Sequence, residues 1–206
     1  MKSNTRILKF VAAAVLVTGS LPVASAAGLL GERYAAATFD WVFPDDNDVD
    51  NGRGVTLTLN QPLTTSIDLA LTYSYLDTGA NFGFGNIDIS GQNLMFGGTY
   101  HMQAQGMKPF IGVSAGWLGT KVDGSTDNDT VFQIVPGVEI PAGEKASLRL
   151  YAAYSDYFDN EPEDEGVWSF GAVADFDINE TWGLLTEINL DEDSNWGLSF
   201  GALVRF

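Results

Sequence analysis

Cysteine is absent from the 206-residue chain, histidine occurs once, and Lys and Arg together number only 10 against 27 Asp and Glu. Without cysteine there is no disulfide framework, thiolate metal site or cysteine nucleophile. The formal net charge of −17 argues against nucleic acid as a partner, because contacts to phosphates need a basic surface. After the N-terminal region, no apolar run approaches the roughly 20 residues of a transmembrane helix.

Few residues are charged, yet the acidic excess is large. Charged residues make up 18% of the chain and aromatic residues 12%, with 45% hydrophobic residues overall. This composition is unlike that of disordered chains, which are poor in apolar residues and rich in charge. The acidic residues must therefore be concentrated in particular parts of the sequence.

The first 26 residues have the three parts of a secretory signal peptide. Lys2, Arg6 and Lys9 form a basic start, residues 10–17 are apolar, and residues 24–26 are a small-residue cleavage site. We predict a cleaved signal peptide at 1–26 and a single domain at 27–206. Cleavage removes three bases and leaves seven against 27 acids, a net charge of −20.

The mature chain is predicted to be all-β, because apolar residues recur at every second position. Trp168, Phe170 and Phe176, for example, alternate with small or polar residues. Clusters of Gly, Pro, Asn and Asp separate the segments. Pro136 cannot donate a ladder hydrogen bond and predicts a bulge. About ten strands are predicted, near residues 32–43, 53–61, 66–76, 88–101, 109–120, 131–141, 146–156, 166–177, 182–190 and 195–206.

The connections between these segments fall into two classes. Alternate gaps are acidic, at residues 44–52, 77–87, 121–130, 156–165 and 191–194, and they hold 17 of the 27 acids. The intervening gaps hold only Glu144 and Glu180. Alternate connections of an up-and-down antiparallel sheet emerge at opposite ends. The sequence therefore predicts one strongly acidic end and one nearly neutral end.

Segment length favours a membrane barrel over a soluble secreted β-sandwich. The segments are near ten residues long, as needed to cross a bilayer at a tilt, whereas soluble strands usually have about five or six. The face opposite the apolar one is small and polar, which suits the interior of a narrow closed barrel. Aromatic residues gather near segment ends, as in the interfacial girdles of membrane barrels. These are Trp41, Phe43, Tyr73, Tyr75, Tyr100, Phe110, Trp117, Tyr154, Trp168, Trp182 and Trp196.

Two stretches, residues 108–117 and 196–206, resemble strands of the small outer-membrane β-barrel superfamily, which contains OmpA-type and opacity-type barrels of Gram-negative bacteria. The resemblance implies a closed antiparallel up-and-down transmembrane barrel in the bacterial outer membrane, reached through the periplasm. Type members have eight strands, so eight remains the alternative to ten. The last strand is similar to the signal read by the barrel assembly machinery, carried here by Trp196, Leu198, Phe200, Val204 and Phe206.

Charged residues on the polar face are predicted to point into the barrel lumen. Six are acids and two are bases: Asp40, Asp68, Glu139, Arg149, Asp175, Asp177, Glu187 and Arg205. Glu139 and Arg149 lie on neighbouring strands and are expected to pair, since charges removed from water need partners. A packed polar network is one interpretation of the set, and a cation-preferring lumen is the other.

Metal binding and catalysis have little support in the sequence. Asp46, Asp48 and Asp50 mimic the start of a calcium loop, but Asn51 and Leu57 occupy its Gly and Glu positions. Loose Ca²⁺ or Mg²⁺ binding here, or at Glu161, Glu163 and Asp164, is the alternative to a solvated acidic surface. The single histidine, His101, is expected at a short turn away from most acids, so no catalytic site is predicted.

The sequence thus predicts a monomeric outer-membrane β-barrel that is not an enzyme, with acidic extracellular loops and a structural or surface-interaction role. Its expected partners are outer-membrane lipid, lipopolysaccharide and the assembly machinery, and no cofactor is expected. A narrow cation-preferring diffusion pore is the alternative. An outer-membrane lipid-modifying enzyme and a soluble β-sandwich are less favoured.

Overall fold

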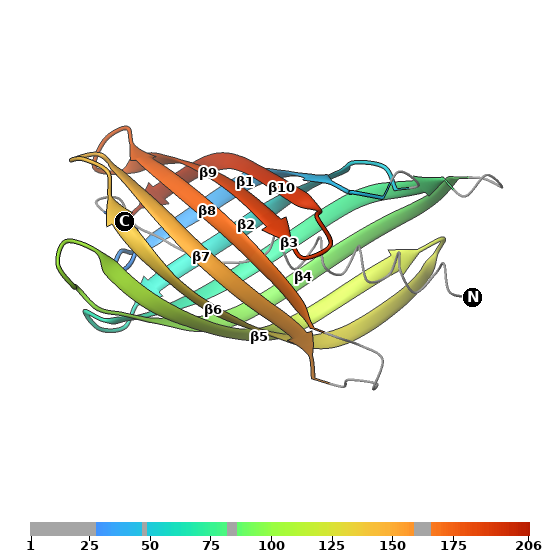
Figure 1. Cartoon of the computed structure of the whole chain (residues 1–206), viewed down its shortest axis with the longest axis horizontal. Helices are drawn as coiled ribbons and strands as arrows, with labels where there is room; N and C mark the ends of the chain where they lie inside the picture. Colours follow the sequence, from blue (N-terminus) through green and yellow to red (C-terminus); the bar gives the residue numbers. More distant parts are fainter. Residues whose placement is uncertain (1–27, 47–48, 82–85, 159–165) are drawn as a thin grey trace.

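The computed structural model describes residues 28–46, 49–81, 86–158 and 166–206, which form ten antiparallel strands in one closed barrel (Figure 1). The predicted all-β fold and strand count are confirmed, and the eight-stranded alternative is wrong. The predicted signal peptide, residues 1–26, lies outside the described residues. The strands are β1 (Tyr34–Phe43), β2 (Gly52–Pro62), β3 (Ile67–Asn81), β4 (Asn86–His101), β5 (Lys108–Val122), β6 (Ser125–Pro141), β7 (Ala146–Tyr157), β8 (Val167–Asp177), β9 (Trp182–Asp191) and β10 (Trp196–Arg205).

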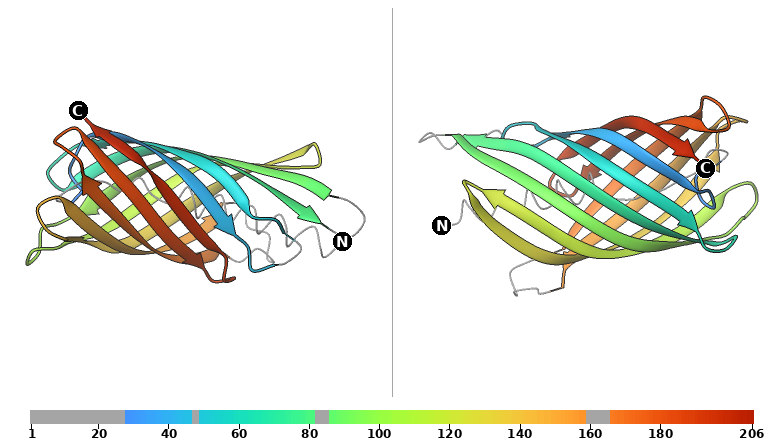
Figure 2. Two further views of the ribbon diagram at one scale, coloured as in Figure 1. Left: turned by 90° about the horizontal axis from the view of Figure 1, so that it is seen from above. Right: turned by 180° about the vertical axis from the view of Figure 1, so that it is seen from behind.

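Each strand pairs with its neighbours in sequence, and β1 closes the barrel against β10, with Tyr34 opposite Arg205. We call the end that carries Tyr34 and Phe206 the terminal end and the opposite end the loop end. The hairpins β3–β4 and β5–β6 extend furthest at the loop end (Figures 1 and 2). Within the described residues, no helix has the length and apolar character needed to cross a membrane.

The register determines how steeply the strands are inclined. A row that passes from each residue to its paired residue on the next strand runs once around the barrel. Starting at Lys108 of β5, this row returns to β5 at Thr120, twelve residues further along the strand. With a strand spacing of about 4.8 Å and a rise of about 3.4 Å per residue, this shift tilts ten strands by about 40°. At that tilt about ten residues rise roughly 25 Å, the height of the apolar band of outer-membrane barrels. The row is Lys108, Glu139, Arg149, Val173, Glu187, Ser199, Asp40, Gly54, Leu76, Gly91 and Thr120.

The alternation in the sequence divides the barrel into an outer and an inner face. In β10, Trp196, Leu198 and Phe200 are exposed on the outside, whereas Gly197 and Ser199 are buried inside. Large apolar side chains cover the outer wall on every strand. Such a wall is stable only against lipid, because a soluble protein rarely exposes so large an apolar surface.

Aromatic side chains pack together on the outer wall near the loop end. Phe43 contacts Trp196 with ring centroids 6.4 Å apart, and Tyr154 contacts Trp168 at 5.1 Å. Tyr100, Trp182 and Phe206 are exposed near the terminal end. Both rims of the wall therefore carry the amphipathic side chains that favour a membrane interface.

The β5–β6 hairpin is longer than predicted. Residues 121–130, expected as an acidic loop, are almost all strand, and the turn is the pair Asp123 and Gly124. Both turn residues have positive φ, 46° and 84°. An Asp-Gly pair is the typical sequence of such a two-residue hairpin turn. The polarity of these residues reflects a hairpin that projects beyond the apolar wall.

The bulge predicted at Pro136 is wrong. Pairing of β6 with β7 is interrupted between Ile134 and Gly137, but their partners Tyr154 and Tyr151 are the same number of residues apart. On the other side, Pro136 pairs in register with Ile111. The proline therefore interrupts the ladder locally without inserting a residue.

Candidate functional site in the barrel lumen

The eight charged residues predicted for the lumen all occupy inward positions of their strands. Asp40, Asp68, Glu139, Arg149 and Asp175 are buried. Asp177, Glu187 and Arg205 are partly buried. Because five inward charges lie on the register row that starts at Lys108, the tilt arranges them as a rising series inside the barrel: Lys108, Glu139, Arg149, Glu187 and Asp40.

Glu139 is the centre of the largest charge network. Arg149 Nη2 lies 2.9 Å from Glu139 Oε2, and Lys108 Nζ lies 3.2 Å from Oε1. The Arg149 guanidinium also lies over the Phe110 ring, 5.7 Å from its centroid. Two cations and one carboxylate share this part of the lumen, so each buried charge has an opposite charge nearby.

The chain segment before β1 reaches into this network. The backbone N–H groups of Leu29 and Leu30 donate to Glu139 Oε2 at 2.9 and 3.4 Å, and Lys108 Nζ donates to the Leu30 carbonyl at 3.0 Å. Sequence reasoning missed this segment because its two leucines show no alternation. The only signal is an apolar pair between Gly28 and Gly31, shortly after the predicted cleavage site.

Asp68 forms a second contact with the same segment. Its Oδ2 accepts the Gly31 N–H at 2.9 Å and lies 3.5 Å from His101 Nε2. His101 is the last residue of β4, next to the short turn that the sequence predicts, and its side chain is buried on the inner face of that strand. His101 is therefore a partner of the Asp68 carboxylate within the packed interior.

The middle of the lumen contains two acids that flank Ser199 in the register row, Asp40 and Glu187. Asp40 accepts hydrogen bonds from Thr38 at 3.0 Å and Thr56 at 2.8 Å. Glu187 accepts a hydrogen bond from the Tyr151 hydroxyl. Hydroxyl groups therefore satisfy these carboxylates in place of cations.

The remaining predicted charges lie on β8 and β10 at the terminal end. Asp175 accepts a hydrogen bond from the Ser147 hydroxyl. Asp177 pairs with Arg205, with 2.7 Å between Oδ1 and Nη1. This pair joins non-neighbouring strands across the short strand β9.

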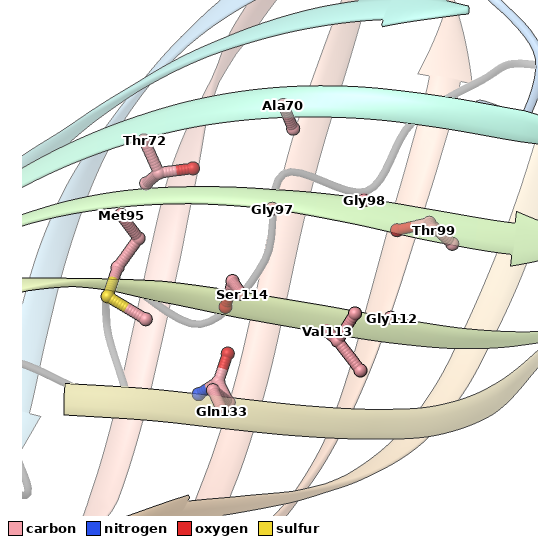
Figure 3. A pocket seen from close by; sticks show the side chains of 10 residues that line it. All are labelled: Ala70, Thr72, Met95, Gly97, Gly98, Thr99, Gly112, Val113, Ser114 and Gln133. Carbon is pink, nitrogen blue, oxygen red and sulfur yellow. The ribbon is translucent and has the colours of Figure 1, made fainter. Parts of the chain in front are cut away.

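Apolar side chains form a buried cluster on part of the inner wall toward the loop end. A buried cluster lies among β1, β3, β4, β5 and β6 and consists of Val42, Leu76, Ala80, Ile89, Met95, Leu118 and Val131. Beside it, at the inner face of β3–β6, small residues leave a cavity of about 20 Å³ next to Thr72, Ser114 and Gln133 (Figure 3). That volume is room for about one water molecule.

The acidic candidates for metal binding are only partly within the described residues. Asp46 and Asp50 are exposed at the loop end, whereas Asp48, Glu161, Glu163 and Asp164 lie outside the described residues. Across the described ranges, no group of three or more potential ligand side chains could hold a metal ion.

One acidic connection has a structural role. Asp191 is buried, and its carboxylate accepts the N–H groups of Asp193 and Asn195 at 3.0 and 2.9 Å. Asn195 in turn accepts the Asp45 N–H at 3.0 Å. This acid stabilises a turn and links the first and last loops.

Comparison with known proteins supports the architecture. Residues 11–206 match the family described as "Outer membrane protein beta-barrel domain". No curated protein sequence matches the chain.

Three solved structures illustrate the similarity of fold. The translocator domain of the autotransporter NalP from Neisseria meningitidis has a TM-score of 0.52 at 16% identity, covering 100% of this chain and 95% of that one. The β domain of the Bordetella autotransporter BrkA has a TM-score of 0.54 at 12% identity, with 85% and 99% covered. The NanC porin has a TM-score of 0.53 at 7% identity, with 84% and 100% covered.

A double-mutant cycle tests the energetic role of the Glu139 network. Glu139→Gln leaves Arg149 and Lys108 without their carboxylate and should lower the free energy of unfolding by about 3–5 kcal/mol. Glu139→Gln combined with Arg149→Met should cost less than the sum of the single changes, as measured by urea unfolding of the refolded barrel. Asp177→Asn, in a more exposed pair, is the control and should cost less. If the losses of unfolding free energy in the two single variants add up to the loss in the double variant, Glu139 and Arg149 are not energetically coupled.

Proposed function

The chain belongs to the family of outer membrane proteins with a β-barrel domain, and from that premise we propose that it is a closed, monomeric, non-enzymatic barrel with a structural or surface-interaction role. As a protein of the bacterial outer membrane, it is oriented in this proposal with the terminal end toward the periplasm and the loop end outside. Residues 1–26 direct export and are then removed.

The filling of the lumen is the observation that carries this proposal. Toward the loop end, the lumen holds the apolar cluster that includes Leu76 and Leu118. Toward the terminal end, it holds the Glu139 network and the segment that contains Leu29 and Leu30. Ten strands enclose a space that side chains can largely fill, whereas porins with a wide channel have 16–18. A filled interior favours a role at the surface.

The acid excess of the lumen favours the second candidate, a narrow pore for cations. The predicted set has six acids and two bases, and Lys108 adds a third base. Rings or series of carboxylates attract cations into a pore. The narrow interior of a barrel of about ten strands limits this candidate to a low conductance.

Planar-bilayer recording distinguishes the two candidates. The closed barrel should give no reproducible conductance steps, because side chains can largely fill the interior of a barrel of about ten strands. Cation-selective steps that lose their selectivity in Asp40→Asn would overturn the proposal and establish the pore. Glu144→Gln, which removes an acid from an exposed turn, is the matched control and should behave like the unmodified protein.

An enzymatic role has less support. His101 is buried at the terminal end, where its close carboxylate partner is Asp68. A hydrolytic or acyl-transfer site needs a base next to a nucleophile or an activated water. The Asp68 contact supports a packing role for His101.

We further propose that the loop end contacts lipopolysaccharide. In the absence of divalent cations its acidic surface is solvated, and loosely bound Ca²⁺ or Mg²⁺ bridges its carboxylates to the lipid phosphates. Asp46, Asp50, Asp123, Asp127 and Glu192 are exposed there. Carboxylates and lipid phosphates repel each other because both are negatively charged. Both groups bind hard divalent cations through their oxygen atoms. No protein cofactor is part of this proposal.

Chelation tests the divalent bridge. In bilayers that contain lipopolysaccharide, EDTA should lower the unfolding temperature of the barrel, because carboxylate–phosphate repulsion is then unscreened. In bilayers of zwitterionic lipid, EDTA should have no effect. An unchanged unfolding temperature in both bilayers would exclude the bridge and leave the solvated surface.

The final strand supports a role in assembly through the barrel assembly machinery. The outward residues Trp196, Leu198, Phe200 and Val204 lead to Phe206, whose side chain is 70% exposed. The Phe206 N–H makes one long hydrogen bond, 3.4 Å to the Arg33 carbonyl. Phe206 therefore contributes little to the finished fold.

Deletion of Phe206 should reduce the amount of assembled barrel in the outer membrane while leaving the stability of refolded protein nearly unchanged. Phe176→Ala removes another exposed aromatic side chain from the same rim and is the control. The heat-dependent gel shift of membrane fractions measures assembly. Equal assembly of both variants and the parent would contradict the role of Phe206.

A further inference from the structure

Two groups of hydrogen-bonded polar side chains line the inner wall of the barrel. In the first group, the Thr56 hydroxyl donates to Asp40 Oδ2 at 2.8 Å, and the Ser74 hydroxyl lies 3.0 Å from that of Thr56. In the second group, Gln133 Nε2 donates to the Ser155 hydroxyl at 3.0 Å. The first group spans β1, β2 and β3, and the second spans β6 and β7. Strands β4 and β5 separate the two groups.

The cavity of about 20 Å³ lies at these separating strands. One row of paired residues along its lining consists of Ala70 on β3, Gly97 on β4, Ser114 on β5 and Gln133 on β6. Gly97 has no side chain, so the space between Ala70 and Ser114 stays open (Figure 3). A Cβ on Gly97 would lie 2.5 Å from the Ser114 Cβ and 2.6 Å from the Val113 carbonyl oxygen. A larger residue at position 97 would therefore displace Ser114 from the cavity.

Thr72 brings a buried hydroxyl to this cavity. Its side chain lines the cavity from β3 and is only 2% exposed. Among the described residues, none provides a hydrogen-bond partner for Thr72 Oγ1. Buried hydroxyl groups in folded proteins are nearly always hydrogen-bonded, because a group withdrawn from water without a partner is costly. The cavity beside Thr72 has room for such a partner.

The lining indicates a ligand that is neutral and as small as water. Ser114 and Gln133 also present polar side chains to the cavity, and among the described residues no charged side chain lines it. Gln133 donates its Nε2 to Ser155, and its amide oxygen, which points toward Ser114 in Figure 3, can accept a hydrogen bond. Two hydroxyl groups and one amide oxygen match the three partners that a buried water typically has.

We propose that this cavity is a specific binding site for one internal water molecule, held by Thr72, Ser114 and Gln133. The water donates to the Gln133 amide oxygen and exchanges hydrogen bonds with the two hydroxyl groups. It thereby extends the second group across β5 to Thr72 of β3, the strand on which the first group ends at Ser74. Polar side chains then form one belt on the inner wall from β1 to β7, whether or not the lumen conducts ions.

A high-resolution crystal structure of the refolded, unmodified barrel tests the site directly. Density for one water should lie about 2.5–3.0 Å from Thr72 Oγ1 and within hydrogen-bond distance of Ser114 or Gln133. The water should be lost in Thr72→Val and kept in Thr72→Ser, which retains the hydroxyl. A dry cavity in the unmodified protein would overturn the proposal, even if Thr72→Val failed to refold.

The sign of the stability change in Thr72→Val is a second test, because valine has nearly the shape of threonine. If water is bound, the change leaves it with one partner fewer and should raise the equilibrium constant of unfolding about three-fold or more. If the cavity is dry, the change removes an unsatisfied hydroxyl and should lower that constant. Urea unfolding of the refolded barrel measures the constant, and a lowered or unchanged value contradicts a bound water.

Energetic coupling between Thr72 and Gln133 separates a bridging water from the effect of either side chain alone. These residues lie on β3 and β6, which do not pair. Gln133→Met should change the unfolding constant at least about two-fold less in Thr72→Val than in the unmodified protein, because the bridge is already absent. Thr120→Val is the matched control: Thr120 is a buried threonine of β5 away from the cavity lining, and its substitution should leave the effect of Gln133→Met unchanged. Equal effects of Gln133→Met in all three backgrounds would overturn the proposal.

Discussion

Closure of the hydrogen-bond ladder in an apolar surrounding is the constraint on which the rest of this structure depends. Lipid offers no partner to a backbone N–H or C=O, so an open edge would leave a row of unsatisfied polar groups. Pairing of β1 with β10 removes that edge. Closure at ten strands with a shift of twelve residues also determines the strand tilt, and the tilt determines how the inward side chains meet.

The narrow lumen follows from that closure and explains the chemistry inside it. Side chains from opposite walls come into contact, so charges there are withdrawn from water and need partners. Glu139 has Arg149 and Lys108, whereas Asp40 has hydroxyl groups. The same narrowness allows four residues before β1 to fill the terminal end.

Much of this architecture could be predicted from alternation. The segment at 195–206 has the same outward and inward residues in the sequence pattern and in β10. The expected neighbours Glu139 and Arg149 form an ion pair because a short turn joins their strands. The polarity of residues 121–130 predicts an irregular loop, whereas in the structure it marks a hairpin that projects beyond the apolar wall. The missing N–H of Pro136 predicts a bulge, but a local interruption of the ladder between β6 and β7 accommodates the proline.

The chain's local pattern by itself determined the strands, their two faces and the grouping of acidic gaps, because each depends on residues adjacent in sequence. Only the tertiary structure decided which inward side chains meet. Leu29 and Glu139 are 110 residues apart and come together through the register of a closed sheet. His101 and Gly31 share Asp68 for the same reason. Period-two alternation contains no information on the shift around the barrel, and that shift brings these residues into contact.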